Sequence, residues 1–274
     1  MEIIQAAVLG LVQGITEFLP ISSSGHLVLF QHLFGLTEPH LEFGIAVHIG
    51  TLLAVVLFFF GNIRSLVATL VRFLLQAVRR NRPDPIGYAR LDLKMAALIG
   101  VGCIPTALIG LAFYRISDTL FSSISLVGVM LIITGILLYL TRWKKKAEKT
   151  IQTFTLTDAL IIGLVQGMAI LPGISRSGAT IAAAVFLGIR KEIAAEFSFL
   201  LSIPAILGAG AFMVKDVVGE PGPWNLNVLL AGSLVSAIVG YFSLYVLVFM
   251  IKKGRLHFFA PYCWLLGAAV FIII

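Results

Sequence analysis

A run of hydroxyl side chains followed by a histidine interrupts the first apolar stretch of this sequence. Ser22, Ser23, Ser24, Gly25 and His26 come where one expected helix ends and the next begins. A single serine there would be explained as a helix N-cap, but an N-cap requires neither three hydroxyls nor an imidazole. A hydroxyl next to a proton acceptor is the arrangement of an activated nucleophile. We expect Ser23 to be the nucleophile, and His26 to be either its base or an alternative nucleophile.

A carboxylate lies in the helix that leads into this joint. Gln13 and Glu17 are four residues apart, so they share one face of a helix. Glu17 has apolar neighbours, among which a carboxylate is costly. Three roles are open to it: binding a cation together with Gln13, accepting a proton, or forming a structural ion pair.

Arg176 is the strongest candidate for binding an anion. It lies in the segment Pro172–Thr180, the second place where glycine and serine break an apolar stretch. A guanidinium can bind a phosphate through two N–H groups, and the first-turn amides of a helix add partial positive charge. The expected phosphate-binding set comprises Ser22, Ser24 and Gly25 from the first joint and Ser175, Ser177, Gly178 and Thr180 from the second.

These polar residues stand out because the rest of the chain is strongly apolar. Hydrophobic residues make up 59% and charged residues 12% of the 274 residues, which is typical of membrane proteins. We expect an all-α polytopic membrane protein, because the short alternating segments of a transmembrane β-barrel are absent. Six apolar segments have about the length needed to cross the hydrocarbon layer as helices: 43–60, 95–114, 122–140, 197–214, 227–251 and 258–274.

The net charge of +7 comes mainly from basic clusters at 64–94, 142–149, 190–191 and 252–255. Basic residues concentrate in cytoplasmic loops of membrane proteins, so this charge does not indicate nucleic-acid binding. All four clusters fall on one side if six segments span. Segment 63–78 is then expected to lie at the cytoplasmic surface, and residues 3–34 and 158–189 to form re-entrant hairpins around a polar cavity.

The chain contains an internal repeat. The sequence Gly10-Leu-Val-Gln-Gly14 recurs 153 residues later as Gly163-Leu-Val-Gln-Gly167, and Ile-Ser and Ser-Gly pairs in the two joints match at the same offset. Each half has one hairpin and three expected spans, an odd number, so the second half is inverted relative to the first. We therefore predict repeat one at 1–142 and repeat two at 157–274, joined by a basic cytoplasmic connector at 143–156.

The positions at which the repeats differ are expected to carry the chemistry. Glu17 aligns with Ile170, Ser23 with Arg176, and His26 with Ala179. The first half would then supply the nucleophile and the acid–base or metal groups. The second half would supply the phosphate clamp.

At these residues the sequence closely resembles the undecaprenyl-diphosphatase family, also called the bacitracin-resistance protein family. The matching motifs are Gln13 to Glu17, Ser22 to His26 and Pro172 to Thr180, and the resemblance covers nearly the whole chain. It implies hydrolysis of undecaprenyl diphosphate at the outer side of the bacterial inner membrane, and it implies recycling of the lipid carrier for peptidoglycan and tolerance to bacitracin. It also implies dependence on Mg²⁺ or Ca²⁺; Gln13 in place of an acidic residue removes one charged ligand.

The residues alone leave several alternatives open. The nucleophile could be Ser23, His26, or a water activated by a metal and Glu17. Broken helices in inverted repeats are also typical of secondary transporters, so a carrier or flippase for a phosphate-bearing substrate is the main competing function. A membrane lipid environment and a polyprenyl diphosphate substrate are the expected partners, and a homodimer is compatible with the sequence.

Overall fold

The computed structural model describes residues 1–35, 41–78, 88–114, 120, 123–144, 147–219 and 225–273. Parts of the basic clusters and of the connector, at 79–87 and 145–146, lie outside these ranges. The described chain is helical. Its elements are α1 (Ile3–Phe18), α2 (Ser23–Leu33), α3 (Leu41–Phe58), α4 (Phe60–Val78), α5 (Tyr88–Tyr114), α7 (Ile124–Leu140), η1 (Thr141–Trp143), α8 (Leu156–Met168), α9 (Arg176–Phe186), α10 (Lys191–Gly219), α11 (Leu226–Lys252), η2 (Leu256–Phe259) and α12 (Ala260–Ile273).

The long apolar helices agree with the prediction of a multi-pass membrane protein. Within the described ranges, α5, α7, α10 and α11 are each long and apolar enough to span a membrane. A fifth span results if the bent pair α3 and α4 counts as one. The 14 residues of α12 make a helix about 21 Å long, which is short for a span. The predicted number of six spans therefore stays a prediction.

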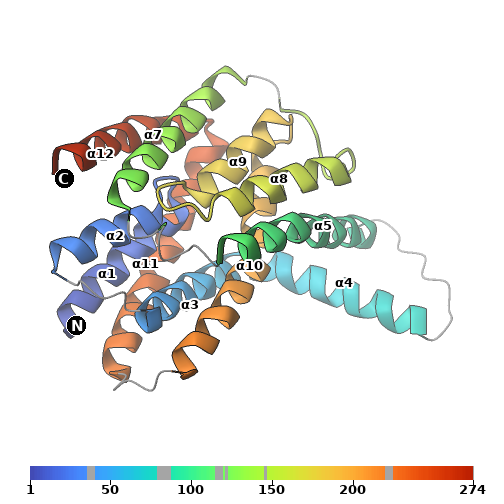
Figure 1. Cartoon of the computed structure of the whole chain (residues 1–274). Coiled ribbons are helices and arrows are strands. Elements are labelled where there is room, and N and C mark those ends of the chain that lie inside the picture. Colours follow the sequence, from blue (N-terminus) through green and yellow to red (C-terminus); the bar gives the residue numbers. More distant parts are fainter. Residues whose placement is uncertain are drawn as a thin grey trace.

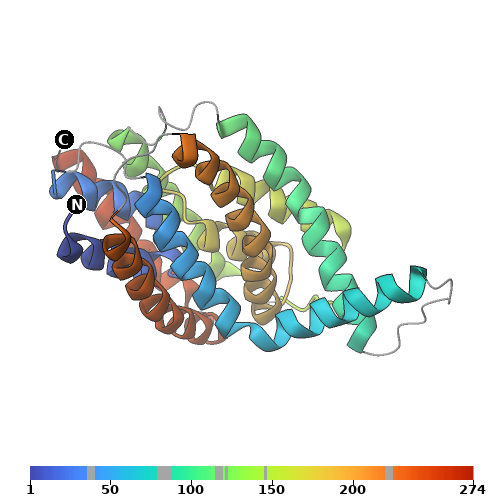
Figure 2. The ribbon, with the colours of Figure 1, turned by 90° about the horizontal axis from the view of Figure 1, so that it is seen from below.

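Helix α4 contacts mainly its chain neighbours α3 and α5 and extends beyond the other helices. It is bent by 80° from α3, none of its residues is buried, and it projects from the rest of the molecule (Figures 1 and 2). A strong segregation of polar and apolar side chains around a helix suits a membrane surface. This position is compatible with the predicted surface helix at 63–78.

Both predicted hairpins are present as two short helices separated by a break. In the first, α1 ends at Phe18 and α2 begins at Ser23; in the second, α8 ends at Met168 and α9 begins at Arg176. Helices α2 and α9 have 11 residues each, or roughly 17 Å, and neither can span a bilayer. Each pair thus turns back at a polar joint, as the sequence predicted.

The first helix of each hairpin packs closely on a long helix of the other half of the chain. Helix α1 packs on α11, and α8 packs on α5. Glycines allow these approaches, because a Cβ on Gly14 would lie 2.9 Å from the Ser236 carbonyl oxygen, and one on Gly167 would lie 2.8 Å from Ile109 Cβ. The motif shared by both halves therefore serves helix packing. It brings the two joints to the middle of the molecule (Figure 1).

Candidate active site

The two joints interlock. A Cβ on Gly178 would lie 2.9 Å from Pro20 Cβ, and one on Gly25 would lie 3.5 Å from Gly173 Cα. The Ser177 hydroxyl donates to the Phe18 carbonyl at 2.9 Å, so the start of α9 caps the end of α1. The residues that the sequence placed in two separate halves are in this way held in one site.

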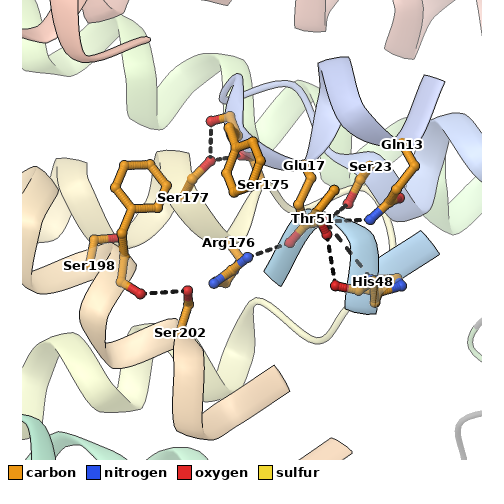
Figure 3. Close-up of polar contacts among 12 residues, drawn as sticks. Gln13, Glu17, Ser23, His48, Thr51, Ser175, Arg176, Ser177, Ser198 and Ser202 are labelled. Carbon is orange, nitrogen blue, oxygen red and sulfur yellow. Dashed lines mark hydrogen bonds and ion pairs between the residues drawn. The ribbon is translucent and has the colours of Figure 1, made fainter. Parts of the chain in front are cut away.

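Glu17 is the centre of this site (Figure 3). Its side chain is buried, and its Oε2 accepts hydrogen bonds from Gln13 Nε2 at 2.9 Å and from the Ser23 hydroxyl at 2.7 Å. Arg176 donates to Oε1 and forms an ion pair with it. His48 Nε2 lies 3.8 Å from Oε2. One carboxylate therefore joins the predicted nucleophile, the predicted phosphate clamp and two further polar side chains.

Arg176 is the first residue of α9, and its side chain is 17% exposed. The guanidinium and the Glu17 carboxylate balance each other's charge, which offsets part of the cost of holding either one in apolar surroundings. The side chain of Arg176 is largely but not fully enclosed. A phosphate that enters the site could take over the hydrogen bond that Arg176 now donates to Glu17.

Ser23 begins α2, and its neighbours shape that helix start. The Ser22 hydroxyl accepts from the Gly25 amide at 3.3 Å and lies 3.4 Å from the Ser24 hydroxyl. Ser22 has φ 71° and is the one non-glycine residue of the described chain with positive φ. Such a conformation persists only when its surroundings hold it in place. Ser23 therefore directly follows a strained residue, and its hydroxyl donates a hydrogen bond to Glu17.

The remaining predicted phosphate ligands mostly hold the second joint together. Ser175 caps α9 by accepting from the Gly178 amide at 3.1 Å. Thr180 bonds to the Arg176 carbonyl at 2.7 Å and pairs with Ser198. Ser177 bonds to the Phe18 carbonyl, so the hydroxyls of Ser175, Ser177 and Thr180 are all buried and hydrogen-bonded within the protein. Their part in phosphate binding stays a prediction; the contacts indicate that they position Arg176.

His26 does not point toward Ser23. Its Nδ1 lies 2.7 Å from the Ser22 carbonyl oxygen, and its Nε2 lies 2.7 Å from the Tyr262 hydroxyl. Both ring nitrogens are therefore occupied. Tyr262 could not be expected from the sequence, because a tyrosine near the start of an apolar helix is common and has no local polar partner.

His48 also lies beside Glu17 and was not among the site residues predicted from the sequence. Its Nδ1 lies 2.8 Å from the Gly44 carbonyl, which can only accept, so Nδ1 carries a proton and Nε2 faces Glu17. Its side chain is 39% exposed. The only sequence signal for this position was a histidine at the expected depth of a span.

Gln13 and Glu17 can supply some of the oxygen ligands that a divalent cation needs. Gln13 Oε1 is buried and has no hydrogen-bond partner among the described residues, so it is an oxygen free to act as a ligand. Hard cations prefer such oxygens, and Mg²⁺ is commonly held by one or two carboxylates together with substrate phosphates. Over the described ranges, no group of three or more His, Cys, Asp or Glu side chains forms a metal site. Gln13 and Glu17 therefore fit a cation only together with oxygens of a substrate.

Comparison with known proteins identifies the family to which the chain belongs. The model of the bacitracin resistance protein BacA family matches residues 6–269. The chain belongs to this family. It is 48% identical over 267 residues to the undecaprenyl-diphosphatase of Desulforapulum autotrophicum, with 97% of this chain and 96% of that protein covered. It is also 47% identical to the undecaprenyl-diphosphatase of Desulfatibacillum aliphaticivorans, with 99% of both chains covered.

Membership in the BacA family spans both joints. The matched range includes all residues from Gln13 to His26 and from Pro172 to Thr180. The interlocked joints thus lie within the part of the chain common to the family. A further relative named undecaprenyl-diphosphatase, from Korarchaeum cryptofilum, is 42% identical over 98% of this chain.

Proposed function

We propose that this chain hydrolyses undecaprenyl diphosphate to undecaprenyl phosphate and inorganic phosphate. The contact of Ser23 and Arg176 with the same Glu17 carboxylate carries the proposal. Phosphoryl transfer requires a positioned nucleophile and positive charge on the transferred group, and this contact supplies both. Family membership, and the printed names of relatives 40–48% identical, support the same substrate.

In the proposed mechanism, Ser23 Oγ attacks the terminal phosphorus while Glu17 accepts the hydroxyl proton. The bond from phosphorus to the bridging oxygen breaks, and undecaprenyl phosphate leaves. Arg176 moves its hydrogen bonds from Glu17 to the transferred phosphoryl group and stabilises its charge. Water then attacks the phosphoserine and the bond from Ser23 Oγ to phosphorus breaks. Ser23 Oγ takes back the proton from Glu17, and the second proton of the water leaves with the phosphate or passes to solvent.

A divalent cation, Mg²⁺ or Ca²⁺, is part of this proposal. Gln13 Oε1 and Glu17 would hold it together with substrate oxygens. When bound, it would neutralise diphosphate charge and polarise the phosphorus–oxygen bonds. The residues of the chain would still orient Ser23, hold its proton and contact the phosphate.

The site is proposed to face the outer side of the bacterial inner membrane, with the isoprenoid tail between helices or in lipid. The exposed apolar side chains of α5 and α11 provide a surface that suits lipid, among them Leu108 at 65% and Leu234 at 63% exposed. Removal of one phosphate outside the cell would return the lipid carrier for peptidoglycan synthesis. It would also remove the diphosphate form and so raise tolerance to bacitracin.

The test is phosphate release from undecaprenyl diphosphate by purified protein in detergent. It would be run with Mg²⁺, with Ca²⁺ and with excess chelator, on wild type, Glu17→Ala and Arg176→Ala. Metal-dependent release that both variants lose would support the proposal. A second arm uses sealed vesicles with substrate on one side; transport of the lipid without phosphate release would support the carrier instead.

Trapping of the phosphorylated enzyme separates the chemical alternatives. Brief incubation with substrate labelled in the terminal phosphate, followed by quenching in denaturant at neutral pH, where both phosphoserine and phosphohistidine survive, is expected to label Ser23. Label on His26 would refute the serine mechanism. Turnover without any label, in a variant with slowed hydrolysis, would favour direct attack by water.

A further inference from the structure

The His26 ring is held on two sides. The Ser22 carbonyl can only accept a hydrogen bond, so His26 Nδ1 donates to it. Nε2 of the neutral ring is then an acceptor for the Tyr262 hydroxyl. The two rings are also stacked, with centroids 5.7 Å apart and planes inclined by 4°. His26 is 4% exposed, so its orientation is fixed by these partners.

The bond from His26 goes to the strained residue of the first joint. Ser22 has φ 71° and ψ 98°, a region that L-residues rarely occupy. A strained residue needs surroundings that fix it. The carbonyl that His26 holds belongs to the peptide that joins Ser22 to Ser23, so its orientation sets the direction in which Ser23 enters α2.

The second joint provides an internal comparison. Ser175 matches Ser22 and has an ordinary extended conformation, with φ −76° and ψ 113°. Ala179 stands where the first joint has His26, and the positive φ of that joint is taken by Gly173. The histidine therefore occurs at the joint where a serine has positive φ, and it is absent from the joint where the residue with positive φ is a glycine.

We propose that Tyr262 and His26 form a positioning pair that holds the Ser22–Ser23 peptide, and that neither residue takes part in phosphoryl transfer. Tyr262 orients the His26 ring, the ring holds the Ser22 carbonyl, and Ser23 is thereby kept against Glu17. This inference rests on the proposed function, because it assigns roles within the same site. It gives α12, at the end of the chain, a direct part in the geometry of the first joint.

The test compares His26→Asn, His26→Ala and Tyr262→Phe. The Asn amide nitrogen takes the place of Nδ1 and can still donate to the Ser22 carbonyl, but Asn cannot act as a base or form a phosphohistidine. We expect His26→Ala to lower kcat about 100-fold, as misplacement of a reacting group does. We expect His26→Asn and Tyr262→Phe to lower it by about three- to tenfold, with little change in KM.

The double variant adds a second readout. Because Tyr262 acts only through the imidazole, Tyr262→Phe should have no further effect when added to His26→Asn. Tyr245→Phe is the matched control, since Tyr245 is 65% exposed on α11, and it should behave as wild type. Circular dichroism and size-exclusion chromatography would establish that each variant is folded.

Two results would overturn the inference. The first is a folded His26→Asn protein as inactive as His26→Ala, which would place the imidazole in the chemistry. The second is full activity of Tyr262→Phe, matching Tyr245→Phe. Failure of the proposed function is a separate result, because it would appear as wild-type protein that releases no phosphate.

Discussion

Arg176 and Glu17 lie 159 residues apart in the chain and form an ion pair that joins the two helix joints. Each is the charged residue of its own joint, and each would be costly among apolar helices without the other. The pair therefore couples stability to function. The same contact that neutralises the joints places the phosphate clamp next to the carboxylate that holds Ser23.

Replacement of Arg176 by alanine should lower both the stability and the activity of the protein. Arg176→Ala leaves a buried carboxylate without its counter-charge, and we expect a loss of about 3–5 kcal/mol in unfolding free energy. We also expect at least about a 10³-fold loss of kcat/KM for phosphate release. Denaturant unfolding in detergent and the phosphate assay would measure the two effects.

The control is the Arg190–Glu192 pair, whose side chains are 54% and 46% exposed. Arg190→Ala should change the unfolding free energy by less than about 1 kcal/mol. Equal losses for Arg176→Ala and Arg190→Ala would contradict the special role of the joint pair.

Ser23→Ala should abolish turnover with little loss of stability. The Ser23 hydroxyl is partly exposed and donates one hydrogen bond to Glu17, so its removal should cost about 1 kcal/mol. Loss of a nucleophile lowers kcat by roughly 10⁴-fold or more. Ser243→Ala, which removes a hydroxyl bonded only within α11, serves as control. Retention of a tenth of wild-type kcat in Ser23→Ala would rule out the serine as nucleophile.

A methyl group on Gly14 should separate α1 from α11. Its Cβ would lie 2.9 Å from both the Ser236 carbonyl oxygen and Val239 Cβ, too close without a shift of backbone. Gly14→Ala should therefore lower the unfolding free energy by about 1–3 kcal/mol. Gly208→Ala, where no atom lies within 4 Å of the new Cβ, should be neutral or stabilising by about 0.5–1 kcal/mol. Thermal unfolding of both variants would check this, and the reverse order would contradict the packing argument.

Asp158 should make stability depend on pH. It lies at the start of α8, outside the long spanning helices. Burial by itself raises the pKa of this carboxyl, but hydrogen bonds from Thr155 and Lys149 outweigh burial and hold the pKa below its ordinary value. A depressed pKa contributes stability above the ordinary pKa, and this contribution is lost as pH falls through the folded-state pKa.

The measurement is the unfolding midpoint of wild type and Asp158→Asn between pH 7 and pH 3. The variant should be less stable at pH 7, and the difference should shrink toward pH 3. Glu148→Gln, which removes an exposed carboxyl from the connector that precedes α8, should follow the wild-type curve. A difference that stays constant over this range would mean that Asp158 does not act through its charge.

The sequence by itself determined the helices, the two joints and the charged residues within them. These features are local: helical periodicity, apolar length, and the break made by glycine, proline and serine depend on neighbours a few residues away. Ser23, Glu17 and Arg176 could be selected in the same way, because a hydroxyl run, a carboxylate and a guanidinium are each conspicuous in apolar surroundings. The repeat added the expectation that the two joints face each other.

Only the tertiary structure decided which side chains meet. His26 was expected near Ser23 but bonds to Tyr262, 236 residues away, and His48 from α3 lies beside Glu17. Such partners depend on how whole helices rotate and approach, which is set by contacts such as Gly14 on Ser236. A rotation of one helix by a single residue, about 100°, would replace every partner without changing the local pattern. For this reason the sequence supplies the chemical groups, and the packing supplies their geometry.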